Sequence, residues 1–243
     1  KCPYCDFNSH GLKSALPEKE HVAHLLDDLA VDAKSIGDRQ VDTVFIGGGT
    51  PSLFSADAMA DIIAGIKARV NLAPDAEITM EANPGTVEAG KFLGFYQAGV
   101  NRISVGIQSF QPQHLAVLGR IHNDDQAINA VKQAHSAGLP TFNLDLMHGL
   151  PQQSVDNAMS DLDKGIALNP YHLSWYQLTI EPNTPFYSRP PDLPDDDILW
   201  EIQEQGHKLL EAAGYQQYEI SAYAKEGHQC RHNLNYWRFG DYL

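Results

Sequence analysis

Residues 41–51 read Val-Asp-Thr-Val-Phe-Ile-Gly-Gly-Gly-Thr-Pro, an apolar run that passes into three glycines and then into a helical pattern over residues 56–70. Short apolar runs of this length are typical of strands buried in a sheet. Glycines at a strand end let the backbone approach a ligand closely and leave N–H groups free to donate. The segment is not a Walker loop, because no lysine follows at the required position. The alternative interpretation is an ordinary tight turn.

The same alternation of strand and helix continues along the chain. Further short apolar runs occupy residues 77–81, 102–107, 141–147 and 172–178. Helical patterns separate the strands and cover residues 17–36, 86–98, 123–137 and 154–168, several of which end at a glycine. This alternation predicts parallel strands joined by crossover helices. It does not by itself distinguish a flat doubly wound sheet from a barrel.

Polar residues at the strand ends favour the barrel. They lie at or just past the carboxyl ends of different predicted strands. The residues are Gly47, Gly48, Gly49, Thr50, Glu81, Gln108 and Asp145. Barrel enzymes assemble their sites from the carboxyl ends of several strands, whereas a flat sheet concentrates its site at one switch point. We therefore predict an α/β fold, a partial (β/α)6 barrel whose first strand lies ahead of Lys1.

The composition of the sequence and its strand–helix alternation change after about residue 180. Residues 181–194 are rich in proline and polar side chains, and a helix over 195–213 and a strand over 216–221 follow. We predict a core barrel over residues 1–180 and the beginning of a C-terminal region over residues 181–243. The chain starts inside a motif and stops at Leu243 without a helix stop, which indicates an internal fragment.

Composition excludes several classes of protein. The 243 residues carry a net charge of −14 with no basic stripe, which argues against a nucleic-acid partner. Three cysteines do not make a disulfide framework, so we expect a reducing, cytoplasmic location. No apolar run approaches the length of a membrane span, and no signal peptide is visible.

Cys2 and Cys5 are separated by two residues, a spacing that lets two thiolates grip one metal centre from a single tight turn. A structural zinc half-site and a redox pair have the same spacing. Zinc needs four ligands, and the third cysteine, Cys230, is very distant in sequence. A redox pair belongs at a strand–helix junction of a small domain, which this chain is not.

Six segments together carry a family resemblance. In chain order they are Cys-Pro-Tyr-Cys-Asp-Phe-Asn-Ser-His (2–10), Gly-Gly-Gly-Thr-Pro-Ser (47–52), Glu-Ala-Asn-Pro (81–84), Ser-Val-Gly-Ile-Gln-Ser-Phe (104–110), Asp-Leu-Met-His-Gly-Leu-Pro (145–151) and His-Asn-Leu-Asn-Tyr-Trp (232–237). The set resembles the radical S-adenosylmethionine (SAM) superfamily, in particular its oxygen-independent coproporphyrinogen III oxidase-like family and the heme chaperone branch of that family. The resemblance covers essentially the whole chain.

The resemblance implies two cofactors. Cys2 and Cys5 would be two ligands of a [4Fe–4S] cluster in a Cys-x3-Cys-x2-Cys loop whose first cysteine would precede Lys1. The open iron of that cluster would bind SAM. The family uses the glycine segment for the methionine moiety of SAM, places Glu81, Gln108 and Asp145 around it, and pairs an arginine at the position of Arg120 with a SAM carboxylate. The alternatives are satisfied core polar residues and a solvated arginine.

The resemblance also implies heme as cargo. In the chaperone branch the histidine of residues 232–237 is implicated in holding heme, so His232 is a candidate axial ligand. His10 and Cys230 are further candidates for auxiliary contacts, to which we assign no role, and residues 218–221 would line the same surface or form a strand. The true coproporphyrinogen dehydrogenases have a further cysteine where this chain has Phe7.

Three functions therefore stay open at this point. The first is a carrier that delivers heme to acceptor proteins such as respiratory cytochromes, with an electron donor for its cluster and with SAM cleavage undecided. The second is a SAM-dependent enzyme that oxidatively decarboxylates coproporphyrinogen III. The third is a metal-free barrel enzyme in which Cys2 and Cys5 are incidental.

Overall fold

The structure is a computed structural model that describes residues 2–7, 15–86 and 90–243. Its strands are β1 (Gln40–Ile46), β2 (Asn71–Ala82), β3 (Arg102–Gln108), β4 (Thr141–His148), β5 (His172–Gln177), β6 (Gln216–Gln217) and β7 (Ala222–Ala224). Its helices are α1 (Glu18–Ile36), α2 (Ala56–Lys67), α3 (Lys91–Ala98), α4 (Pro112–Val117), α5 (Asp124–Ser136), α6 (Val155–Ala167), α7 (Pro185–Ser188), α8 (Asp196–Ala212) and α9 (Arg231–Trp237), with 3-10 turns η1 (Pro51–Leu53) and η2 (Pro84–Thr86).

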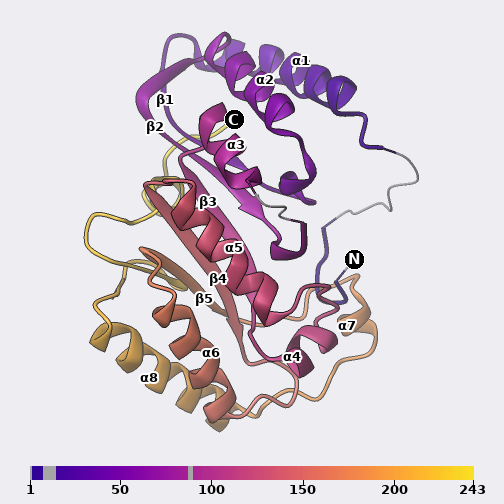
Figure 1. Ribbon diagram of the computed structural model, residues 1–243, viewed down its shortest axis with the longest axis vertical. Helices are drawn as coiled ribbons and strands as arrows, with labels where there is room; N and C mark the ends of the chain where they lie inside the picture. The colour runs from indigo at the N-terminus through magenta and orange to yellow at the C-terminus, as the bar shows by residue number, and fades with distance from the viewer. Residues whose placement is uncertain (1, 8–14, 87–89) are drawn as a thin grey trace.

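One curled sheet organises the described residues. Strands β1 to β5 pair in sequence order and all run parallel, and β7 and β6 add two short antiparallel strands beyond β5. Helices α2, α5 and α6 follow β1, β3 and β4 and lie on the same face of the sheet (Figure 1). The predicted partial (β/α) barrel is confirmed. The additional strand expected ahead of Lys1 stays a prediction, and in the described chain β1 is an edge strand paired only with β2.

The outer face of the sheet is apolar and packs under these helices. Met80, Ile103 and Leu144 come from neighbouring strands and are fully buried against Phe92 and Phe95 of α3 in one continuous core. Because side chains alternate along a strand, the intervening residues all point to the other face. That inner face therefore collects polar side chains from neighbouring parallel strands, among them Glu81, Ser104 and Asn143.

A smaller apolar cluster closes the carboxyl end of the barrel. Leu118, Met147, Leu150, Leu178 and Phe186 are buried together, and Tyr4 packs against them. The Phe186 N–H also donates to the Pro3 carbonyl at 3.0 Å. These contacts fasten the Cys2–Cys5 segment over the carboxyl ends of β3, β4 and β5, where the first residues lie near α4 and α7 in Figure 1.

Most predicted elements are confirmed. The five strands and the helices over 17–36, 56–70, 123–137, 154–168 and 195–213 are all present, with bounds that differ by a few residues. The largest difference is β2, which begins at Asn71 because Asn71 and Leu72 already pair with Gln40 and Val41 before an irregularity in the ladder. Of the predicted helix over 86–98, residues 87–89 lie outside the described residues and α3 begins at Lys91.

The predicted strand over residues 216–221 is wrong. β6 ends at Gln217, and the chain turns back at once so that Gln217 pairs with Tyr223 of β7. The Tyr218 N–H donates to the Ala222 carbonyl at 3.1 Å and closes this turn. β7 then pairs antiparallel with β5. The division of the chain at residue 180 stays a prediction.

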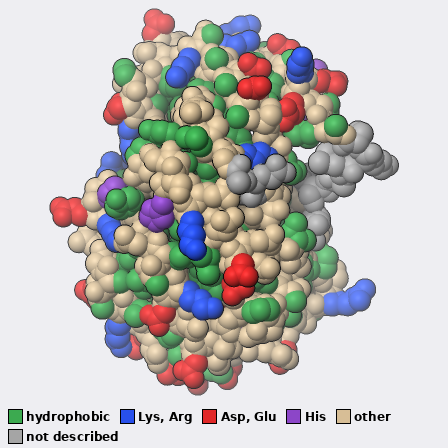
Figure 2. All heavy atoms as spheres, viewed as in Figure 1, with side chains coloured by type: hydrophobic (Ala, Val, Ile, Leu, Met, Phe, Trp, Pro, Cys, Tyr) green, Lys and Arg blue, Asp and Glu red, His purple; other side chains and the backbone are tan. Residues whose placement is uncertain are grey.

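Two observations concern the surface. In the described residues, no helix combines the length and the apolar character needed to cross a lipid bilayer. On the face drawn in Figure 2, Lys and Arg side chains are interspersed with Asp and Glu side chains and do not gather into a basic stripe.

Candidate functional site

The inner face of the sheet carries a polar network. Register pairs Glu81 with Ser104, Ser104 with Asn143, and Asn143 with His172, so these side chains lie in adjacent positions across four strands. Asp145 follows Asn143 by two residues and shares its face. It lies within β4, not at its end as the sequence indicated, because β4 continues to His148. The site is therefore built in the lumen of the half-barrel as well as on its rim.

Glu81 and Asp145 are two partly buried carboxylates facing this lumen. Burial, with a smaller contribution from the negative charge of Asp145, raises the pKa of Glu81 to about 7, and the Gly48 N–H opposes the rise by donating to Glu81 Oε2 at 3.2 Å. Burial also raises the pKa of Asp145, against hydrogen bonds to its carboxylate from Ser104 (3.0 Å) and Asn143 (2.7 Å). Both carboxylates are placed to accept hydrogen bonds from a ligand.

The glycine turn lies directly against Glu81. A Cβ at Gly47 would lie 3.2 Å from Glu81 Cδ and 3.1 Å from the Phe45 ring, so a larger residue would displace one of them. Gly48 has φ +101°, a backbone conformation that L side chains rarely adopt. Thr50 ends the turn, where its carbonyl accepts the Leu53 N–H at 3.0 Å to open η1. The turn therefore needs glycine at residues 47 and 48 for physical reasons.

Gln108 and Arg120 meet at the end of β3. Gln108 is buried, has φ +69° as the last residue of the strand, and accepts a hydrogen bond from the Tyr176 hydroxyl at 2.7 Å. Arg120 follows α4 and donates from Nη2 to the Gly106 carbonyl at 2.6 Å. Its other amino group, Nη1, lies 3.8 Å from Cys2 Sγ. Arg120 is thus held in the site and is not a solvated surface arginine.

Cys2 and Cys5 belong to one tight turn, in which the Cys5 N–H donates to the Cys2 carbonyl at 3.2 Å. Both are free and partly exposed. Between them, burial raises the pKa of Tyr4 to about 12, against the opposing charge of Arg120. In the part of the chain that the structure describes, no cluster of three or more His, Cys, Asp or Glu side chains is placed to hold a metal ion. The turn therefore presents two thiols and needs further ligands to hold a cluster.

The structure separates Cys230 and His232 from these thiols. Cys230 is buried at the base of the lumen and donates from Sγ to Glu77 Oε1 at 3.3 Å. Burial raises its pKa to about 11, which disfavours a thiolate. His232 lies in the first turn of α9, beside the edge strand β1. His10 lies outside the described residues.

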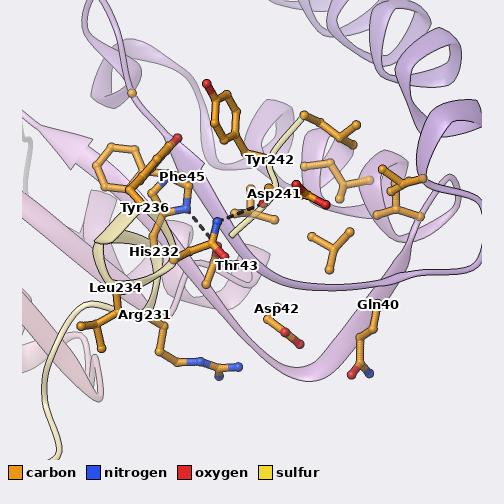
Figure 3. Close-up of a pocket in the computed structure, with 18 of the residues that line it drawn as sticks. Gln40, Asp42, Thr43, Phe45, Arg231, His232, Leu234, Tyr236, Asp241 and Tyr242 are labelled. Atoms are coloured by element: carbon orange, nitrogen blue, oxygen red, sulfur yellow. Dashed lines mark hydrogen bonds between the residues drawn. The ribbon is translucent and has the colours of Figure 1, made fainter. Parts of the chain in front are cut away.

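His232 faces a cavity of about 1020 Å³ that runs along the free edge of β1. In Figure 3, His232 lies beside Thr43, Phe45 and Tyr236, and a dashed line marks its hydrogen bond with Thr43. His232 Nδ1 is 2.9 Å from Thr43 Oγ1, and the ring stacks on Phe45 with centroids 5.0 Å apart and planes at 26°. Burial lowers the pKa of His232, which favours the neutral imidazole.

Gly47, Gly48 and Glu81 line the same cavity. Phe45 contacts His232 on one side and approaches Gly47 on the other. The glycine turn and the histidine thus border one hollow, although His232 does not contact the Arg120 side of the site.

Several residues of the site were missed from the sequence. Arg102 and His172 are both buried in the lumen, and His172 bridges Asn143 (Nδ1 to Oδ1, 2.6 Å) and Tyr218 (Nε2 to the hydroxyl, 2.7 Å). The signal that could have found them is polar residues at every second position of otherwise apolar strands, as in residues 102–104, 143–145 and 172–176.

Comparison with known proteins gives three kinds of match. Residues 1–162 match the sequence profile of a family described as "Radical SAM superfamily". "Heme chaperone HemW" of Escherichia coli (strain K12) is 65% identical over 243 residues, which are 100% of this chain and 64% of that protein. "Radical S-adenosyl methionine domain-containing protein 1, mitochondrial" of Mus musculus is 35% identical over 251 residues, 100% of this chain and 56% of that protein.

A solved structure has the same fold. The structure reported as "Coproporphyrinogen III oxidase (HemN) from Escherichia coli is a Radical SAM enzyme" superposes with a TM-score of 0.84, covering 98% of this chain and 55% of that chain at 22% identity. At this identity the likeness shows the fold alone. The chain spans 64% and 56% of the two curated relatives above, which is less than two thirds of their length.

Proposed function

This chain belongs to the radical SAM superfamily, and from that premise we propose that it is the core of a heme chaperone that binds a [4Fe–4S] cluster, SAM and heme. The support is the 65% identity over the whole chain to a protein named as a heme chaperone, together with a cavity that carries His232. The relatives extend well beyond this chain, so the activity of the whole protein is part of the proposal.

The thiol end of the lumen suits the cluster and SAM. Cys2 and Cys5 would ligate iron from one turn, and the third thiolate of the family pattern would come from ahead of Lys1. Arg120 beside Cys2, the N–H groups of Gly47, Gly48 and Gly49, and the buried polar groups of Glu81, Gln108 and Asp145 would orient SAM, with Thr50 closing the turn. When bound, the cluster and SAM supply one-electron chemistry, while the protein contributes binding, orientation and exclusion of water.

The α9 end of the cavity suits heme. A neutral imidazole is the form that binds iron, and burial favours this form of His232 by lowering its pKa. The Phe45 ring stacks on the imidazole and the Tyr236 ring meets it edge to face, and together they provide apolar ring surface that suits a flat macrocycle. This half-buried imidazole, which lines a cavity together with aromatic rings, is the observation that carries the heme assignment.

The remaining parts of the proposal concern the cell. The protein would work in the cytoplasm, accept heme there, and pass it to acceptor hemoproteins such as respiratory cytochromes. An electron donor would reduce the cluster. The small number of cysteines agrees with a reducing compartment.

Heme titration of the full-length polypeptide, followed by absorbance, tests the proposal. The full-length form is used because the curated relatives extend well beyond this chain, which covers 64% of the E. coli protein. We expect a saturable heme spectrum that is lost in His232→Ala and kept in His24→Ala, whose side chain is 76% exposed on α1. An unchanged spectrum in His232→Ala contradicts the assignment of His232.

The rival function is oxidative decarboxylation of coproporphyrinogen III. The fold likeness to the E. coli oxidase agrees with either function, and Phe7 stands where the dehydrogenases have a cysteine. An anaerobic assay with coproporphyrinogen, SAM and a reductant separates the two. We expect no release of carbon dioxide, and substrate-dependent release overturns the chaperone proposal.

A further inference from the structure

The carboxylate of Glu77 accepts hydrogen bonds from the residues that begin α9. Its Oε2 accepts the Arg231 N–H at 3.0 Å, and its Oε1 accepts the His232 N–H at 3.1 Å and the Cys230 thiol at 3.3 Å. The first N–H groups of a helix have no partner within the helix, so a carboxylate from another element satisfies them and fixes where the helix begins. Glu77 lies on β2 and thereby attaches α9 to the sheet.

Thr43 is the register partner of Glu77 on the neighbouring strand β1. Because they are paired across the ladder and face the same lumen, the two side chains approach His232 from adjacent positions. The Glu77 carboxylate accepts the backbone N–H of His232, and the Thr43 hydroxyl is hydrogen-bonded to Nδ1 of the His232 ring at 2.9 Å. Phe45, two residues further along β1 on the same face, stacks against the ring. The imidazole is therefore fixed in both position and rotation.

The contact with Thr43 also bears on the tautomer of His232. A hydroxyl oxygen can accept a hydrogen bond from Nδ1–H, which leaves the Nε2 lone pair free. In the described part of the chain, Nε2 of His232 has no hydrogen-bond partner. Histidines that bind metals usually donate the other ring N–H to a fixed acceptor, which sets the ring orientation and raises its basicity as a ligand.

We propose that Glu77 and Thr43 are positioning residues for His232: Glu77 sets the start of α9, and Thr43 accepts from Nδ1 so that Nε2 is presented to heme iron. This inference rests on the proposed function and assigns roles to two residues on β1 and β2 that lie outside the six motif segments.

The test is heme titration of full-length Glu77→Gln, Thr43→Val and Thr43→Ser, with resonance Raman of the ferrous iron–histidine stretch. Thr43→Val keeps the shape and removes the acceptor, so we expect about tenfold weaker heme binding and a shifted stretching frequency. Thr43→Ser restores the hydroxyl and should return both to near the wild-type values. Glu77→Gln presents an NH₂ group to one of the α9 N–H groups and should weaken binding by a similar factor.

Two controls match these variants. Thr79→Val lies two residues from Glu77 on the same face of β2, is fully buried, and has a hydroxyl without a hydrogen-bond partner, so heme binding should not change. Asp75→Asn removes an exposed negative charge. Arg231 Nη1 donates to the Asp75 carbonyl at 2.8 Å and to Asp75 Oδ2 at 3.4 Å, so this variant tests the effect of charge without changing the acceptor of the α9 N–H groups.

The outcomes separate the inference from the proposed function. If His232→Ala keeps the heme spectrum, the proposed site itself is wrong. If His232→Ala loses the spectrum while Thr43→Val and Glu77→Gln bind heme as the wild type does, with an unchanged stretching frequency, the positioning roles are overturned and the chaperone proposal stands. Should Glu77→Gln not fold, as judged by circular dichroism, the Thr43→Val and Thr43→Ser pair decides alone.

Discussion

At the scale of single residues, Glu81 is a carboxylate of the site that titrates near neutral pH. Burial and the charge of Asp145 raise its pKa from 4.5 to about 7. Between these two values the folded state binds more protons than the unfolded state, so the free energy of unfolding falls as pH rises. Below about pH 4.5 both states are protonated and Glu81 contributes nothing. Above about pH 7 the full cost, on the order of 3 kcal/mol, is present.

We predict that Glu81→Gln removes this cost from the ligand-free protein. The glutamine keeps an acceptor for the Gly48 N–H but has no charge to bury. The melting temperature of the variant should match the wild type at pH 4.5 and exceed it increasingly up to pH 8, measured by thermal unfolding across that range. Glu20→Gln, at an exposed position on α1, is the control and should give no such trend. A constant difference across the range contradicts the raised pKa.

The site residues that the sequence predicted are those with an unusual chemical type at a strand end. Gly47, Glu81 and Gln108 stand out because an apolar run stops at each of them. Thr43 and Glu77 do not, since a threonine or glutamate near the start of a strand is common on a half-exposed sheet. Their roles depend on contacts with His232 of α9, which lies 189 residues from Thr43 and 155 residues from Glu77 in the chain. The sequence pattern around either residue does not predict such a distant contact.

At the scale of elements, Asp161 of α6 fixes the loop between β3 and α4. Its carboxylate accepts the Ser109 hydroxyl at Oδ2 (2.5 Å) and the Phe110 N–H at Oδ1 (3.0 Å), and it is almost fully buried. Burial is the main cause that raises its pKa, while these hydrogen bonds favour the ionised form. The same loop begins at Gln108 with φ +69°, so this contact holds the carboxyl end of β3 in its strained conformation.

We predict that Asp161→Ala lowers the free energy of unfolding by about 3 kcal/mol, because it leaves two buried donors without an acceptor. Asp161→Asn keeps an acceptor for the Phe110 N–H, and the Ser109 hydroxyl can rotate to accept from its amide, so it should cost less than half as much. Urea unfolding followed by tryptophan fluorescence measures both. Equal losses in the two variants would show that the cost is one of charge or packing, and not of the unpaired donors.

Elements with strong local signals were predicted well. α5 and α6 begin within one residue of the expected places because Asn123 and Ser154 form capping boxes with residues three positions on. Short elements were missed: α4, α7 and α9 have four to seven residues each, too few for a helical period to be visible. The sequence predicts one strand over residues 216–221, whereas these residues form β6 and the turn after it. The turn resembles a strand in sequence because it contains β-favouring residues such as Tyr218 and Ile220.

At the scale of the whole molecule, hydrogen bonds connect the two ends of the lumen. Asp145 accepts from Asn143, whose carbonyl oxygen contacts His172, and His172 contacts the Tyr218 hydroxyl. That hydroxyl accepts the Cys230 N–H at 3.2 Å, and the Cys230 thiol donates to Glu77. A polar interior of this kind is stable only when its groups are paired, which explains why the inner face is so densely hydrogen-bonded.

The two ends nevertheless carry different ligands in the proposed function, and this gives a prediction for the whole protein. Cys2 and Cys5 lie with Arg120 at the carboxyl end, whereas Cys230 and His232 lie with Glu77 at the base of α9. Cys5→Ala should therefore abolish bound iron and sulfide after anaerobic reconstitution of the full-length polypeptide. Cys230→Ala should leave both contents unchanged, because a buried thiol that donates to a carboxylate is not a cluster ligand.

Heme binding should follow the opposite pattern. His232→Ala should lose the heme spectrum and keep wild-type iron and sulfide, whereas Cys5→Ala should keep the heme spectrum, because its side chain lies outside the set of groups that line the cavity. Iron, acid-labile sulfide and heme absorbance are measured on the same preparations of the three variants. Loss of the cluster in Cys230→Ala would show that a cluster ligand lies at the base of the lumen, and it would contradict the placement of the cluster at the carboxyl end. Loss of both ligands in any one variant would show that cluster and heme occupy a single site.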